Sequence, residues 1–298
     1  MISMTTRQRK VKVWLNSSRE PVLQMSEPYD KPYMYVRDCY SEYYAYVKKV
    51  LASSYKRKYV SITGTPGTGK SMFYNWFFDK YRSENRDQII VCASFSDQRH
   101  LKRCFSFEFG KDPVRHKEIP EIMGAMYLYD GPPVDAPEEE RMVAFCSPND
   151  DWFDLVRKRD EHVTLYMPVW EFDELVDADK CLGLGIGTPE LTERFIFFGG
   201  LPRYCLKDAD YTRNAKFEFR ELLSDASKSV QSLDENSNWL FHYAPVYIDT
   251  IAADFPPTLP IHKKLIPCSK YIFRELITLL SNREDGHKSI EFLQGMLK

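Results

Sequence analysis

Short apolar runs alternate with helical patterns through the first 170 residues of the chain. Each run is rich in aliphatic, aromatic or β-branched side chains and is flanked by turn-forming residues. These runs predict five β-strands, at 59–63, 88–93, 125–129, 142–146 and 163–167. Because the runs are apolar on both faces and helical segments separate them, we expect a parallel sheet covered by helices on both sides.

Helical spacing of apolar residues predicts an amphipathic helix within 37–57 and a largely buried, aromatic-rich helix at 70–82. Later in the chain the same spacing predicts helices at 171–180, 188–198, 212–233 and 268–282. Prolines break up the stretch from 245 to 267. A mostly helical C-terminal region, without more sheet, is therefore expected.

Three parts of the chain follow from this pattern. We expect an N-terminal segment with one amphipathic helix at 1–58, an α/β core at 59–170 and a mostly helical region at 171–298. With 298 residues, 43% of them hydrophobic and 14% aromatic, the chain can bury a sizeable core and is unlike a disordered protein.

Charge and cysteine content narrow the functional classes. The formal net charge of −2 gives no support for direct binding to nucleic acid, although Arg7–Lys12 is a basic run. Seven scattered cysteines without a C-x-x-C pair, and six histidines without metal-ligand spacing, indicate reduced thiols in an intracellular protein. Because no secretory h-region and no apolar run of transmembrane length occur, we expect neither a signal peptide nor a membrane span.

The strongest chemical signal is a glycine-rich turn directly after the first predicted strand. Residues 64–71 read GTPGTGKS and match the phosphate-loop pattern in full. The predicted nucleotide-binding residues are Gly64, Thr65, Pro66, Gly67, Thr68, Gly69, Lys70 and Ser71. Glycines permit the dihedrals that aim backbone N–H groups at phosphate, Lys70 would reach the β- and γ-phosphates, and Ser71 would ligate Mg²⁺.

An acid at the end of a neighbouring strand is expected to help hold the metal. Asp130 ends the apolar run GAMYLYD and is the predicted second metal-binding residue. Many hydrolysing relatives place a glutamate next, but here the next residue is Gly131. That glutamate acts as the base for the attacking water, and Asp135 and the run Glu138–Glu140 are candidate substitutes for it. The sequence therefore supports nucleotide hydrolysis less strongly than nucleotide binding.

Polar residues farther along the chain are candidates for contacts with the γ-phosphate. Ser147 and Asn149 follow the fourth predicted strand, where a sensor would stand, although a simple turn explains them equally well. Arg203 follows Gly199-Gly200 and Pro202, and it could neutralise developing phosphate charge or form a structural ion pair. Lys70, Asp130, Ser147 and Arg203 are the candidate catalytic residues.

The combined motifs resemble the P-loop NTPase domain of Crinkler-type effectors and of the related retrotransposon hot spot proteins. The matching pieces, in order over about residues 33–297, are YMYVRDCYSEYY, SITGTPGTGKSMF, MYLYDGPP, VAFCSPN, LYMPVWEFDEL, RFIFFGGLPRYCL and CSKYIFREL. The resemblance implies a three-layer ASCE-type core related to AAA+ and STAND ATPases. It also implies phosphate binding at 64–71, metal coordination at Asp130, sensing near Ser147, and a helical region that bears Arg203.

Such proteins commonly add an N-terminal translocation domain and a C-terminal effector domain, and Crinkler-type members act in a host nucleus. This sequence starts just before the NTPase and ends at Lys298, so a fragment or an NTPase-only version is expected. Secretion into a host rests on the resemblance alone.

Three functions remain open at this stage. The leading hypothesis is a nucleotide-dependent switch that binds ATP with Mg²⁺, with slow hydrolysis or hydrolysis aided by a protein partner or a second copy. A small-molecule kinase is the second, in which Arg99, Arg103 and Arg115 would form a lid. The third is a non-hydrolysing nucleotide-binding interaction module. No guanine-specificity motif occurs, and ATP is the default through the resemblance.

Overall fold

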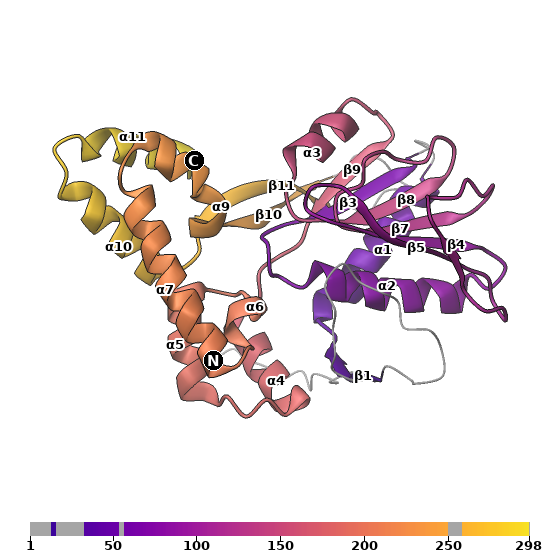
Figure 1. Ribbon diagram of the computed structural model, residues 1–298, viewed down its shortest axis with the longest axis horizontal. Helices are drawn as coiled ribbons and strands as arrows, with labels where there is room; N and C mark the ends of the chain where they lie inside the picture. Colours follow the sequence, from indigo (N-terminus) through magenta and orange to yellow (C-terminus); the bar gives the residue numbers. More distant parts are fainter. Residues whose placement is uncertain (1–12, 16–32, 54–56, 250–257, 298) are drawn as a thin grey trace.

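A central seven-stranded sheet organises the first half of the molecule (Figure 1). The computed structural model describes residues 13–15, 33–53, 57–249 and 258–297, so the basic run Arg7–Lys12 lies outside the described residues. The strand order is β6-β5-β4-β7-β8-β3-β9. The strands are β3 (Tyr59–Thr63), β4 (Ile90–Phe95), β5 (Leu101–Phe107), β6 (Val114–His116), β7 (Met126–Asp130), β8 (Arg141–Phe145) and β9 (His162–Tyr166).

The five strands predicted from the sequence are confirmed and run parallel to one another. In β3, β4 and β7 every residue is buried, because helices cover both faces. The antiparallel strands β5 and β6 were not predicted, and they extend the sheet beyond β4. Because many residues of β5 and β6 are exposed, these strands lack the continuous apolar sequence that identifies the inner strands.

Helices lie on both faces of this sheet. The predicted amphipathic helix is α1 (Asp38–Ala52), and it packs with α2 (Lys70–Glu84) on one face, where Tyr43, Phe73 and Phe77 are fully buried. The other face is covered by α3 (Asp150–Arg157), whose Trp152 is also fully buried. The fold is therefore α/β with a mostly parallel sheet, an arrangement compatible with a three-layer sandwich.

The rest of the chain builds a second hydrophobic core from helices, centred on Phe198, Phe219 and Leu276. Its helices are α4 (Phe172–Leu182), α5 (Thr188–Phe198), α6 (Pro202–Cys205), α7 (Ala209–Ala226), α8 (Val230–Glu235), α9 (Ser237–Leu240), α10 (Lys270–Ser281) and α11 (Gly286–Met296). None of the described helices is long and apolar enough to cross a membrane. A short antiparallel pair, β1 (Val13–Leu15) and β2 (Tyr33–Tyr35), completes the N-terminal part.

A long hairpin links the two parts of the molecule and contradicts the expectation of no further sheet. Its strands are β10 (Phe241–Asp249) and β11 (Thr258–Pro267), and it extends from the helical region toward β9 (Figure 1). The prolines between residues 245 and 267 led to the prediction that this stretch contains no strands. Pro245, Pro260 and Pro267 lie in a two-stranded ladder, where both strands are edge strands, and edge strands tolerate a missing N–H donor.

Candidate functional site

The loop of residues 64–71 connects β3 to α2 at the carboxyl edge of the parallel strands. Gly64, Gly67 and Gly69 have φ angles of 144°, 86° and 94°, a region that other residues rarely adopt. A Cβ on Gly64 would lie 2.7 Å from the backbone oxygen of Met167. The glycines of the motif are therefore required by the backbone path of this loop.

Lys70, the first residue of α2, is folded into the loop. Its ammonium group donates hydrogen bonds to the backbone oxygens of Gly64 and Thr65, each at 2.9 Å, and the residue is only 6% exposed. Burial lowers the pKa of Lys70 to about 7, and the nearby positive charge of Arg203 acts in the same direction. Lys70 donates its hydrogen bonds to neutral carbonyls, with the Asp130 charge nearby, and a buried ammonium group in this position can accept an anionic partner.

Ser71 and Asp130 meet beside the loop, although 59 residues separate them in the sequence. The Ser71 hydroxyl donates to Oδ1 of Asp130 at 2.7 Å, and Asp130 is 1% exposed. Asp130 ends β7, and its neighbour across the ladder on β4 is Ser94. The Ser94 hydroxyl is buried and has no hydrogen-bond partner among the described residues.

The oxygen atoms at this point fit a hard divalent cation. Mg²⁺ prefers oxygen ligands and commonly takes one or two protein groups together with substrate phosphates and water. Ser71 and Asp130 supply a hydroxyl and a carboxylate in contact, and the unpartnered hydroxyl of Ser94 lies on the same face of the sheet. Within the described residues, no group of three or more His, Cys, Asp or Glu side chains could hold a metal by itself.

Arg203 lies against the loop, although it comes from the helical region. A Cβ added to Gly67 would lie 3.0 Å from Cβ and 3.4 Å from Cδ of Arg203. The preceding glycines permit this approach, because a Cβ on Gly199 would meet the backbone oxygen of Cys268 at 2.0 Å, and one on Gly200 that of Trp170 at 2.0 Å. The geometry brings Arg203, exposed on α6, next to the same loop as Lys70.

The two predicted sensor residues, Ser147 and Asn149, have different surroundings. Asn149 is the N-cap of α3, where its side chain accepts from the backbone N–H of Trp152 at 3.0 Å and donates to the backbone oxygen of Asp97 at 3.4 Å. Ser147 is half-buried at the end of β8, and its role stays a prediction. The buried thiol of Cys146 lies near Lys70, and burial raises the pKa of this thiol to about 12.

The acids proposed as a substitute base are placed elsewhere. Asp135 pairs with Arg159 at 2.9 Å, and Glu139 pairs with Lys58 at 3.2 Å. Glu138–Glu140 directly precede β8, so they lie at the amino edge of the parallel strands, opposite the loop. The suggestion that Glu138–Glu140 replace the missing base is therefore wrong, whereas for Asp135 it stays a prediction.

The position after Asp130 is closed to a side chain. Gly131 has a φ of 101°, and a Cβ there would lie 2.8 Å from the backbone oxygen of Phe95. The chain therefore passes too close to β4 for a glutamate at this position without a backbone shift.

Three contacts that were not predicted from the sequence connect the loop to other parts of the chain. The indole N–H of Trp170 donates to the backbone oxygen of Thr68 at 2.8 Å, and the backbone N–H of Tyr243 donates to the Thr65 hydroxyl at 2.8 Å. The Tyr40 hydroxyl donates to the backbone oxygen of Gly69 at 3.3 Å. Trp170 belongs to the MPVWEFDEL motif, so the sequence could have identified it. Tyr243 contacts the loop through its backbone N–H, which any residue except proline could supply, so the sequence could not have identified it.

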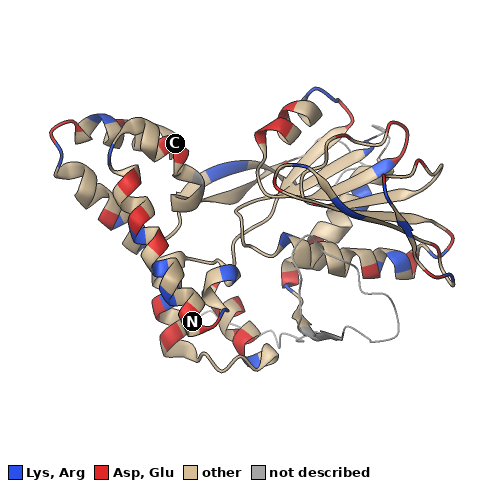
Figure 2. Ribbon diagram, in the orientation of Figure 1, with Lys and Arg blue, Asp and Glu red and all other residues tan. Residues whose placement is uncertain are grey.

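The arginines of the kinase hypothesis come from the antiparallel strands and from the turn after β4, and their role stays a prediction. Arg103 and Arg115 are exposed on β5 and β6, the antiparallel strands at the far edge of the sheet. Arg99 donates to the backbone oxygen of Pro133 at 3.0 Å and so fastens the turn after β7. Figure 2 shows acidic and basic residues mainly on the helices and connecting segments, whereas the inner strands of the sheet are largely uncharged.

Comparisons of the chain with protein-family models, with curated proteins and with solved structures find no match. The case for a function is therefore made from the residues and their geometry.

Proposed function

We propose that this protein is a Mg²⁺-dependent, nucleotide-binding P-loop NTPase that acts as a switch. The contact between Ser71 and Asp130 at 2.7 Å carries the proposal, because it joins the two predicted metal-binding residues from separate motifs beside the loop. The strand order supports an ASCE-type core, in which one strand lies between the loop strand and the acid-bearing strand, as β8 does here.

Each residue has a defined part in this proposal. Lys70 exchanges the carbonyls of Gly64 and Thr65 for the β- and γ-phosphate oxygens. Ser71 and Asp130 hold the metal, which supplies charge neutralisation on the phosphates. Arg203 approaches over Gly67 and adds a second positive charge near the terminal phosphate.

The proposed switch rests on the contacts that the loop makes with other parts of the molecule. Trp170 and Arg203 connect the loop to the helical region, and Tyr243 connects it to the hairpin. A nucleotide that moves Lys70 and the loop backbone changes the geometry of these contacts. The helical region and the hairpin are therefore the proposed output of binding.

A non-hydrolysing nucleotide-binding module is the second candidate, and Gly131 favours it. The backbone oxygen of Phe95 blocks a side chain at this position, Glu138–Glu140 lie at the opposite edge of the sheet, and Asp135 is paired with Arg159. We therefore propose slow hydrolysis, or hydrolysis completed by a protein partner or a second copy of the chain. ATP is the proposed nucleotide through the family resemblance.

Titration calorimetry with ATP and Mg²⁺ tests the proposal. Lys70→Ala is expected to weaken binding by more than about tenfold, because charge-assisted hydrogen bonds to phosphate are lost. Lys49→Ala is the matched control, since Lys49 is exposed in the last turn of α1. Equal affinity of wild type and Lys70→Ala would overturn the proposal.

Phosphate release and native mass spectrometry separate the two candidates. Slow hydrolysis predicts a release rate that Asp130→Ala abolishes, whereas the non-hydrolysing module predicts equal background rates for both proteins. Native mass with and without ATP shows whether a second copy joins the complex and raises the rate.

A further inference from the structure

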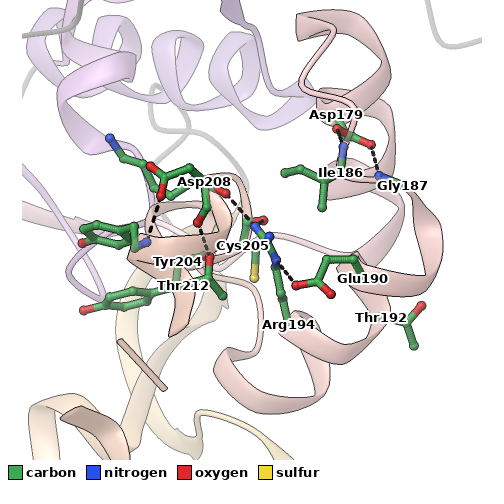
Figure 3. A network of polar contacts seen from close by, with 12 residues as sticks. Asp179, Ile186, Gly187, Glu190, Thr192, Arg194, Tyr204, Cys205, Asp208 and Thr212 are labelled. Carbon is green, nitrogen blue, oxygen red and sulfur yellow. Dashed lines mark hydrogen bonds and ion pairs between the residues drawn. The ribbon is translucent and has the colours of Figure 1, made fainter. Parts of the chain in front are cut away.

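A cavity of about 670 Å³ lies in the helical region, between the 183–187 loop, α5 and the start of α7 (Figure 3). This volume falls within the range of roughly 300–1,000 Å³ that is typical of small-molecule sites. Its lining includes no residue of the loop at 64–71. The cavity is therefore separate from the candidate nucleotide site.

One wall of the cavity is fixed by a buried acid. The Asp179 carboxylate is 7% exposed and accepts from the backbone N–H groups of Ile186 at 3.0 Å and Gly187 at 2.9 Å. These bonds hold the 183–187 loop at the start of α5 (Figure 3). Because Asp179 occupies these N–H groups, they do not serve an external anion.

A buried arginine fixes the opposite wall. Arg194 is 3% exposed and donates to the backbone oxygens of Cys205 at 3.1 Å and Lys207 at 2.6 Å. It also pairs with Glu190 at 2.8 Å. With both walls held by satisfied polar groups, the cavity is preformed, which lowers the entropy cost of binding a ligand.

The charges around the cavity are predominantly positive. Its charged lining residues are Glu190, Arg194, Lys207, Asp208, Arg213 and Lys216. Both acids have a partner, since Arg194 holds Glu190 and the Asp208 carboxylate accepts from the backbone N–H of Tyr211 at 2.8 Å.

Two of the bases each lie within electrostatic reach of one of these acids, Lys207 of Asp208 and Lys216 of Glu190. Among the described residues, neither Lys207 nor Lys216 forms an ion pair with a carboxylate. Their side chains are exposed and half-buried, respectively. The other wall residues include the apolar side chains Leu184, Ile186, Leu206 and Ala209.

We propose that this cavity binds a small phosphate monoester with an apolar body, held by Lys207 and Lys216. The cavity lining has four basic and two acidic side chains, so a phosphate dianion matches its excess positive charge, and the apolar wall covers the rest of the molecule. This site does not depend on nucleotide binding at the loop.

Calorimetry with 1-naphthyl phosphate tests the site in a Lys70→Ala background, which removes the phosphate lysine of the loop. We expect one molecule bound per chain. Adding Lys207→Gln and Lys216→Gln is expected to weaken binding on the order of a hundredfold, about tenfold for each charge-assisted contact. Adding Lys49→Gln and Lys288→Gln instead removes the same charge at exposed positions outside the cavity and is expected to leave binding unchanged.

Two further probes define the chemistry. The monoanion 1-naphthoate is expected to bind about tenfold more weakly than the phosphate, and neutral 1-naphthol more weakly still. Absence of binding by 1-naphthyl phosphate, an equal loss in both double-lysine variants, or equal affinity for naphthoate would overturn the proposal. The fate of ATP binding in Lys70→Ala is a separate measurement, so the two proposals fail independently.

Discussion

Arg37 braces the segment that positions the loop, and its removal gives the sharpest test of the structure. Its guanidinium is 2% exposed and bonds both carboxylate oxygens of Glu174, at 3.1 and 2.8 Å. It also donates to the backbone oxygens of Pro168 at 2.9 Å and Val169 at 3.0 Å, and it lies 5.0 Å from the Trp170 ring centroid. The MPVWEFDEL motif is thus tied to the start of α1.

The expected loss of unfolding free energy follows from the groups that Arg37→Ala leaves without a partner. Glu174 is 9% exposed in the native protein, and in Arg37→Ala its carboxylate loses both guanidinium donors while it keeps the bond from the backbone N–H of Glu171, at 3.1 Å. Two backbone oxygens also lose their donors. Removing one partner of such a buried pair costs about 3–5 kcal/mol of unfolding free energy. Arg37→Lys keeps the charge but not the forked geometry, so an intermediate loss is expected.

Urea unfolding of a matched set measures this effect. The double variant Arg37→Met, Glu174→Leu is expected to lose less stability than Arg37→Ala, because no uncompensated charge stays buried. Lys111→Ala breaks the exposed pair with Glu108, at 2.6 Å, and is expected to change stability by less than about 0.5 kcal/mol. A loss below about 1 kcal/mol in Arg37→Ala, or a double variant as unstable as the sum of its singles, would refute the reasoning.

Three other substitutions test the site and the hairpin. Arg203→Ala is expected to weaken ATP binding about tenfold while leaving ADP binding nearly unchanged, as competition calorimetry can measure. Ser94→Ala is expected to raise unfolding free energy by about 1 kcal/mol, because it removes an unpartnered buried hydroxyl, and to raise the Mg²⁺ concentration needed for nucleotide binding. Burial lowers the pKa of His242 to about 4, so the unfolded chain binds more protons between about pH 6.5 and 4 and stability falls as pH drops through this window. His242→Asn should reduce that slope in urea titrations, and His162, whose pKa burial also lowers to about 4, contributes to the slope that remains.

Sequence periodicity was sufficient for the inner strands and for several helices. The strand Tyr59–Thr63 and the helix Thr188–Phe198 have the predicted bounds, because local apolar spacing alone marks them. The hairpin was missed because its strands pair with each other at two open edges, where proline is permitted. Pairing of this kind depends on a second segment, which the pattern within a single segment does not report.

The candidate site likewise combines features that local sequence predicts with features that depend on the fold. The glycine positions of the loop and the acid Asp130 follow from local motif chemistry. The unsuitability of Glu138–Glu140 follows only from their place at the amino edge of the sheet, which depends on the direction of β8. Ser94 could not have been singled out, because its significance comes from its ladder partner Asp130.

The loop is the point where the three parts of the chain meet. Tyr40 reaches it from α1, Trp170 and Arg203 from the helical region, and Tyr243 from the hairpin. Three of these contacts use a backbone or hydroxyl oxygen of the loop as acceptor, so they restrain its path without occupying Lys70. In the proposed function, phosphate and metal would act on Lys70 and Ser71, whereas the surrounding structure contacts Thr65, Thr68 and Gly69. Because the two sets of contacts share one short backbone, a change in either set alters the geometry available to the other.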